Sequence, residues 1–134
     1  MLQAKNISKS YGNLQVLSDV SLNVKKGEIV AIVGKSGSGK TTLLHIMGTL
    51  DKADEGIVQL NDQNITNFKP KELAQFRNEK LGFIFQFHHL LAEFTAVENV
   101  MIPALIGKKN INASKEKAIE LLSYLGLSER LEHK

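Results

Sequence analysis

Polar and apolar residues alternate in the first part of the chain. Val20, Leu22 and Val24 are separated by polar residues, which is the period of a β-strand with one face in water. A turn at residues 25–27 ends this pattern. We therefore predict an antiparallel β portion over residues 1–27.

A different apolar pattern begins after this turn. Residues 28–33 form a β-branched run without alternation, and residues 81–86 form a second compact apolar run. A strand that is apolar on both faces belongs in a sheet covered on both sides, as parallel sheets are. The sequence thus predicts two buried strands here, and a further short strand over residues 56–60.

Helical patterns fill much of the remaining chain. They predict helices over residues 40–47, over residues 70–78 and from Ala96 onward. We expect Gly126 to end the last long helix and Ser128 to cap one more short helix. The predicted apolar face of the long helix consists of Ala118, Ile119, Leu121, Leu122 and Leu125.

The composition narrows the class of protein. A chain of 134 residues with 43% hydrophobic and 23% charged residues is typical of one globular domain. It has no cysteine, which excludes disulfides and thiol catalysis. No apolar run has the roughly 20 residues of a membrane helix, and the N-terminus lacks the apolar core of a signal peptide. The net charge of +3 is scattered, so nucleic acid is a disfavoured partner.

A glycine-rich loop carries the chemistry. It matches G-x-x-x-x-G-K-[ST] and lies between a predicted strand and a predicted helix. Its backbone N–H groups and the following helix N-terminus favour phosphate. Lys40 adds a positive charge, and the Thr41 hydroxyl is an Mg²⁺ ligand. The loop residues are Gly34, Lys35, Ser36, Gly37, Ser38, Gly39, Lys40 and Thr41.

Two other interpretations of this loop are weaker. A chance match in a flexible linker does not explain three glycines in register with Lys-Thr between a strand and a helix. A dinucleotide-binding G-x-G-x-x-G pattern fails because Thr42 stands where its third glycine belongs. The loop by itself fits GTPases, small-molecule kinases and several kinds of ATPase.

Three further segments resemble the ATP-binding subunits of ABC transporters. Tyr11, within Ser-Tyr-Gly, matches the aromatic residue that stacks on adenine in that family. Residues 81–86 resemble the strand that leads into the family's Q-loop, and residues 90–100 resemble the opening of its helical subdomain. Within the family, residues 44–51 and 85–91 are most similar to the lipoprotein-releasing and macrolide-export branch.

The resemblance implies an α/β fold: a P-loop core with an N-terminal antiparallel β subdomain and the start of a helical subdomain. The implied divisions are residues 1–27, 28–87 and 88–134. The resemblance implies that ATP and Mg²⁺ are the cofactors. It adds Thr42 to the phosphate-binding residues. It also implies that Gln86 acts with Lys40 in catalysis and with Thr41 as a ligand of the metal. The implied partners are a second copy of the subunit and permease subunits that contact Gln86 to Glu98, on the cytoplasmic face of the inner membrane.

Three elements of the family are absent from these 134 residues. The sequence has no Leu-Ser-Gly-Gly-Gln-like segment, no apolar strand ending in Asp-Glu and no counterpart of the switch histidine. In the family these elements complete the partner's ATP site and activate water. We therefore expect the N-terminal part of a longer subunit, and no hydrolysis at a physiological rate by these residues alone.

Other interpretations remain open at this stage. Without the resemblance, Tyr11 is a packing residue and Gln86 satisfies backbone groups at a strand end. A soluble ABC-type nucleotide switch is the alternative to a transport subunit. A small-molecule kinase ranks last, because it needs arginines under a lid and only Arg77 and Arg130 are present. The adjacent pair His88 and His89 lacks the carboxylate spacing of a metal site.

Overall fold

A computed structural model describes residues 1–134 of the chain. It divides into two compact units, Met1–Arg77 and Asn78–Lys134. Each unit is built around its own elements.

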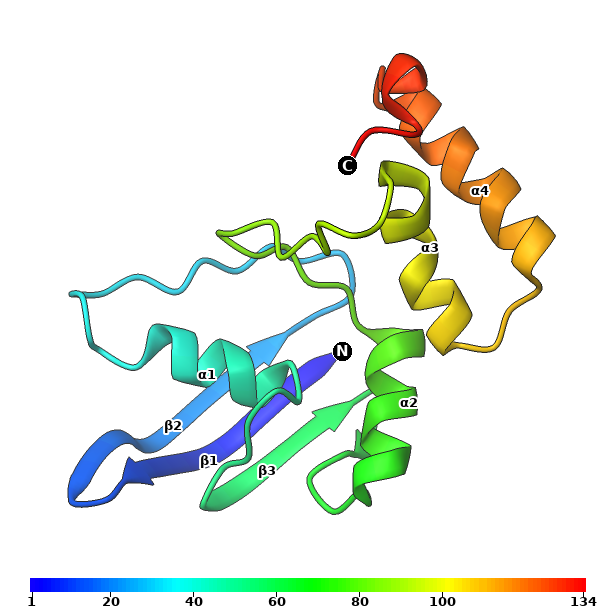
Figure 1. The fold of residues 1–134 in the computed structure, drawn as a ribbon. Helices are drawn as coiled ribbons and strands as arrows, with labels where there is room; N and C mark the ends of the chain where they lie inside the picture. Colours follow the sequence, from blue (N-terminus) through cyan, green and yellow to red (C-terminus); the bar gives the residue numbers. More distant parts are fainter. The chain divides into compact units, whose positions relative to one another are not determined.

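The first unit contains an antiparallel sheet with the strand order β2-β1-β3-β4 (Figure 1). The strands β1 (Leu2–Tyr11) and β2 (Leu14–Val24) form the predicted hairpin, and β3 (Glu55–Leu60) pairs with the other edge of β1. The short strand β4 (Gln63–Asn64) completes the sheet. The antiparallel β portion and the strand predicted near residues 56–60 are both confirmed.

The strand β1 contains a bulge that sets which residues are buried. Ala4 and Ile7 are both buried although three positions separate them, so a strict alternation would send one of them outward. The register shifts between these residues, where Asn6 has a φ of 52°. Asn6 Nδ2 donates to Asp19 Oδ1 at 2.6 Å across the hairpin. The irregularity thus returns the apolar residues to one face.

Helix α1 (Lys40–Met47) lies along one face of this sheet (Figure 1). Its formation confirms the helix predicted after the glycine loop. Burying this helix face against the sheet provides the main apolar core of the unit. The buried apolar residues of the unit are Ala4, Ile7, Leu17, Leu43, Ile46, Met47, Val58, Ile65 and Phe76.

Helix α2 (Pro70–Lys80) begins at a proline, as helices often do, because the first helical N–H needs no partner within the helix. It ends two residues later than the sequence predicts. Phe76 packs edge-on against Phe68, with ring centroids 5.6 Å apart. Arg77 Nη1 donates to the carbonyl of Thr49 at 2.6 Å, which ties α2 to the turn that follows α1.

The two predicted buried strands do not form. Residues 28–33 and 81–86 have no strand partner, and Ile29 is 97% exposed while Ile84 is fully exposed. A strand that is apolar on both faces is stable only between neighbours that pair with it and cover it. No segment of these 134 residues supplies such neighbours, so the local pattern alone does not produce a strand.

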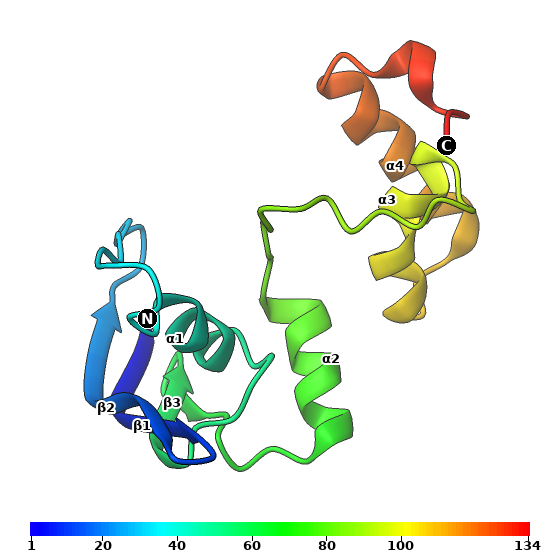
Figure 2. The same cartoon turned by 60° about the vertical axis from the view of Figure 1, so that its left-hand side comes forward.

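The second unit is helical. Helices α3 (Ala96–Ile106) and α4 (Ile111–Tyr124) lie side by side, followed by the short 3₁₀-helix η1 (Ser128–Arg130) (Figure 2). Their shared core consists of Val97, Met101, Ala118 and Leu122. No helix in the protein is both long and apolar enough to cross a membrane.

Two predictions about α4 and the short helix after it are wrong. Leu121 and Leu125 are 44% and 69% exposed, so the buried face of α4 is narrower than the sequence pattern indicates. Ser128 lies within the 3₁₀-helix, and Leu127 occupies the cap position without a side-chain hydrogen bond. Gly126 does follow the end of α4 with a φ of +75°, which confirms its role in ending that helix.

Candidate nucleotide-binding site

The glycine loop wraps around its own lysine. Lys40 Nζ donates to the carbonyl of Gly34 at 3.0 Å and to the carbonyl of Lys35 at 2.6 Å. Ser38 N closes a turn by donating to the Lys35 carbonyl at 3.2 Å. The ammonium group therefore lies against the backbone of the loop and places a positive charge there, as binding of a phosphate chain requires.

Gly39 fixes the loop against the sheet. Its φ is +82°, and a Cβ at this position would lie 2.8 Å from Leu17 Cδ2 and 2.9 Å from the Val16 carbonyl. A side chain is therefore excluded both by the backbone conformation and by β2. This close approach sets the position at which α1 begins.

A small pocket of about 150 Å³ opens beside the start of α1. The helix N-terminus directs unpaired N–H groups and a partial positive charge toward this end. The hydroxyl of Thr41, on an exposed residue, is a hard oxygen ligand of the kind that Mg²⁺ takes together with water and phosphate. The residues therefore fit a Mg²⁺-bound phosphate. The pocket is lined by Val16, Gly37, Ser38, Gly39, Lys40, Thr41 and Thr42.

Tyr11 lies at the end of β1 in the same unit as the loop. Its ring is half exposed, and its hydroxyl donates to Asp51 Oδ2 at 2.5 Å. This bond raises the pKa of Tyr11, as does partial desolvation, while a hydrogen bond with Thr42 opposes the rise. The same bond lowers the pKa of Asp51. The tyrosine is thus held by a specific polar contact, with half of its surface still open to a ligand.

Sequence reasoning missed the polar residues around Tyr11. Lys9, Asp51 and Asp54 form ion pairs, with Lys9 Nζ 3.5 Å from Asp51 and 3.3 Å from Asp54. Partial desolvation lowers the pKa of Lys9, but hydrogen bonds and charges from the two carboxylates outweigh it and raise the pKa overall. In the sequence, Asp51 stands out only as part of residues 44–51, which resemble one branch of a family. Nothing in its spacing from Tyr11 indicates contact.

Gln86 belongs to the second unit, where it is exposed and lies outside any helix or strand. The segment after it is held to α3 by hydrogen bonds. Asn99 on α3 accepts from Leu91 N at 2.9 Å and donates to the carbonyls of Leu91 and Phe94, each at 3.1 Å. The apolar side chains of Leu90, Leu91 and Phe94 remain exposed.

His88 and His89 make separate contacts. His88 Nδ1 accepts a hydrogen bond from Leu90 N at 3.3 Å, and the ring of His89 packs edge-on against Phe85. No group of three or more His, Asp or Glu residues is arranged to hold a metal ion. The carbonyl of His45 instead accepts from the backbone of Leu50 and Asp51 after α1.

The glycine loop, the lysine folded across it and the helix that follows are features of P-loop proteins. The model of a protein family described as "ABC transporter" matches residues 17–134. The chain therefore belongs to the ABC transporter family.

Curated relatives refine this placement. The chain is 53% identical over 134 residues to the lipoprotein-releasing system ATP-binding protein LolD of Bacteroides thetaiotaomicron, with 100% of this chain and 62% of the relative covered. It is 54% identical over 134 residues to the LolD of Porphyromonas gingivalis, with 100% and 61% covered. The chain thus spans a little over three-fifths of the length of the relatives it matches.

Solved structures confirm the fold class. The dimeric structure of MJ0796, a bacterial ABC transporter cassette, matches with a TM-score of 0.89 at 37% identity, covering all of this chain and 61% of the other. A post-hydrolysis structure of the same cassette, bound to ADP and Pi, matches equally well. The chain therefore has the fold of an ABC ATP-binding cassette over the part that it covers.

Proposed function

We propose that this chain binds MgATP through Gly34 to Thr42, and that the protein hydrolyses ATP to drive membrane transport. The observation that carries the proposal is Lys40, whose ammonium group lies across the glycine loop next to the pocket at the start of α1. Membership of the ABC transporter family supports the same chemistry.

Each residue type has a distinct role in this proposal. The N–H groups of residues 34–39 and of the first turn of α1 hold phosphate oxygens, and Lys40 neutralises their charge. The Thr41 hydroxyl holds Mg²⁺, which when bound neutralises charge on the phosphates. Tyr11 stacks on the adenine base. Gln86 orients the attacking water while remaining neutral, and joins Thr41 as a ligand of the metal when it is bound.

We further propose the partners that the family implies. A second copy of the subunit faces the bound ATP, and the dimeric cassette of similar fold supports this arrangement. Permease subunits contact the segment from Gln86 to Glu98, where four large exposed apolar side chains favour protein contact. The protein then lies on the cytoplasmic face of the inner membrane. The names of the relatives favour lipoprotein release as the transport step.

The 134 residues are proposed to bind ATP without hydrolysing it at a physiological rate. They include no apolar strand ending in an acidic pair that would activate water. We also propose a division of the chain into three parts: residues 1–27 form the β subdomain, residues 28–87 form the nucleotide-binding core, and residues 88–134 form part of the helical subdomain.

Thermal unfolding with and without MgATP tests the binding site. A ligand held only by the folded state stabilises it by roughly 2.7 kcal/mol at a hundred times its dissociation constant. We expect MgATP to raise the unfolding temperature of the wild type and of the control Lys26→Ala, which removes the same charge outside the loop. Lys40→Ala should lose this shift. An equal shift in Lys40→Ala would contradict the site.

A second experiment tests the coupling role. In the complex with its membrane subunits, Gln86→Ala should keep MgATP affinity and lose transport-coupled hydrolysis. Crosslinkers placed between residues 86 and 98 should reach the membrane subunits. If these positions stay free in the assembled complex, the transport proposal fails while ATP binding stands.

A further inference from the structure

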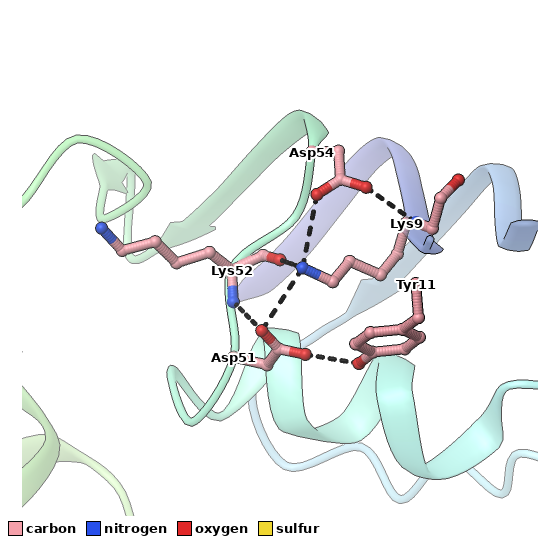
Figure 3. A network of polar contacts seen from close by, with 6 residues as sticks. Lys9, Tyr11, Asp51, Lys52 and Asp54 are labelled. Atoms are coloured by element: carbon pink, nitrogen blue, oxygen red, sulfur yellow. Dashed lines mark hydrogen bonds and ion pairs between the residues drawn. The ribbon is translucent and has the colours of Figure 1, made fainter. Parts of the chain in front are cut away.

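The hydroxyl of Tyr11 connects the end of β1 to the segment after α1 (Figure 3). It donates to Asp51 Oδ2 at 2.5 Å, across forty positions of sequence. Without that bond the ring would turn more freely about its two side-chain torsions, because Tyr11 is half exposed. The contact with Asp51 is therefore the main polar restraint on the ring.

Asp51 is itself fixed to the helix that carries the phosphate-binding residues. Its backbone N–H donates to the carbonyl of His45 on α1 at 3.2 Å. Its second carboxylate oxygen, Oδ1, accepts from the backbone N–H of Lys52 at 2.7 Å. Both carboxylate oxygens are thus engaged, and the orientation of the group follows that of α1. The opposite end of α1 begins with Lys40 and Thr41.

Lys9 supports the same arrangement. Its ammonium group donates to the carbonyl of Lys52 at 2.7 Å and to Asp54 Oδ1 at 3.3 Å, and lies 5.2 Å from the centre of the Tyr11 ring. The side chain is only 12% exposed. A cation at this distance favours one face of the ring. Lys9 therefore compensates the charge of Asp51 and restrains the ring from one side (Figure 3).

We propose that Asp51 is a positioning residue, which holds the ring of Tyr11 at a fixed place relative to the glycine loop and thereby makes binding selective for a triphosphate that carries a flat base. This inference rests on the proposed ATP site. A ring fixed before the ligand arrives loses less conformational freedom on binding, so more of the stacking free energy contributes to affinity. Asp51 acts through Tyr11 and needs no contact with the nucleotide.

The test compares two ligands, MgATP and inorganic tripolyphosphate with Mg²⁺, by calorimetric titration of the protein. The ratio of their dissociation constants measures what the nucleoside contributes. Stacking of a base on an aromatic side chain changes affinity by about five- to 150-fold. We expect Tyr11→Ala to lose most of the preference for ATP. Asp51→Ala and Tyr11→Phe should each lose a substantial part of it, with tripolyphosphate affinity nearly unchanged in both.

Asp54→Ala is the matched control. It removes a carboxylate from the same cluster, but Asp54 bonds to Lys9 and to the backbone N–H of Ser10 rather than to the tyrosine. It should therefore keep the preference for ATP, because Lys9 retains its bond to the Lys52 carbonyl and its ion pair with Asp51. In the double variant Tyr11→Ala/Asp51→Ala, the second change should have no further effect on the ratio. An unchanged ratio in Asp51→Ala overturns the inference, and so does an equal weakening of both ligands.

A measurement without nucleotide separates this inference from the proposed function. The chain has two tyrosines, so in a Tyr124→Phe background the phenol absorbance reports Tyr11 alone. Asp51→Ala should lower the pH at which this phenol ionises, because the bond to the carboxylate raises the pKa of Tyr11. No change would overturn the contact. If instead the proposed ATP site is wrong, Lys40→Ala will keep the shift in unfolding temperature that MgATP produces. That result does not depend on how the Tyr11 phenol ionises.

Discussion

Asn99 pairs with both backbone groups of Leu91, eight positions earlier in the chain. Its side chain accepts from the Leu91 N–H at 2.9 Å and donates to the Leu91 carbonyl at 3.1 Å. The same amide group also donates to the carbonyls of Phe94 and Thr95. One side chain on α3 therefore holds the loop in which exposed apolar residues follow Gln86.

Asn99→Ala should loosen this loop. Because several backbone groups lose their partner, we expect a loss of about 1–2 kcal/mol in the free energy of unfolding. The amide of Leu91 should also exchange its hydrogen faster. Asn112→Ala, at an exposed position of α4, is the control and should change neither quantity. Unchanged exchange at Leu91 in Asn99→Ala would contradict the restraint.

Two glycines of the phosphate loop allow the cost of an unfavourable backbone conformation to be distinguished from the cost of a steric clash. Gly37 and Gly39 have similar φ values of +77° and +82°, but a Cβ at Gly37 meets nothing within 4 Å, whereas at Gly39 it meets Leu17 and Val16. Gly37→Ala should therefore lower the free energy of unfolding by about 1–2 kcal/mol, through the unfavourable backbone conformation alone. Gly39→Ala should cost about 1–3 kcal/mol more, because β2 must move.

Chemical denaturation of both variants measures these costs. The comparison needs no ligand, since the contact with β2 exists in the folded chain itself. Equal costs for the two variants would mean that the loop does not press against β2 as described. In that case Gly39 would be required for its backbone conformation alone.

The cap of α3 makes a third prediction. Thr95 Oγ1 accepts from Glu98 N at 3.3 Å, and a Glu98 carboxylate oxygen accepts from Thr95 N at 2.7 Å. Thr95→Ala should reduce the free energy of unfolding by about 1 kcal/mol, whereas Thr95→Ser, which keeps the hydroxyl, should not. Thermal unfolding of both variants checks this, and a loss of equal size in Thr95→Ser would contradict the cap.

The cluster around Tyr11 predicts how stability depends on pH. The bond from Tyr11 lowers the pKa of Asp51 below its ordinary value of 3.8, and the bond from Ser10 N lowers that of Asp54. The contribution of these two carboxylates to the free energy of unfolding is present above pH 3.8. It is lost as the pH falls through their lower pKa values in the folded state. The pKa values of Tyr11 and Lys9 are raised, so their contribution is lost as the pH rises through the folded values.

We therefore expect stability to be nearly flat around neutral pH and to fall at both extremes. Denaturant titrations at a series of pH values measure this profile. Asp51→Asn should weaken the fall on the acid side, because the variant has no carboxylate to protonate. Asp62→Asn, on a turn outside the cluster, should leave the profile as it is. If stability falls equally at acid pH in the wild type and in Asp51→Asn, the prediction is wrong.

Local patterns in the sequence determine much of this protein. Alternating residues gave the β1–β2 hairpin, and the glycine loop with Lys40 identified the candidate phosphate site, because turns, helix starts and phosphate cradles depend on residues close together in the chain. The capping pair Thr95 and Glu98 is local for the same reason.

Tertiary structure decided the rest. Whether residues 28–33 and 81–86 form strands depends on neighbours that pair with them and cover them, and an apolar run does not reveal whether such neighbours exist. The contacts of Tyr11 with Asp51 and of Asn99 with Leu91 also come from the folded chain. They depend on where a bulged strand, a short helix and a loop bring side chains together. The spacing of these residues in the sequence does not predict the contacts.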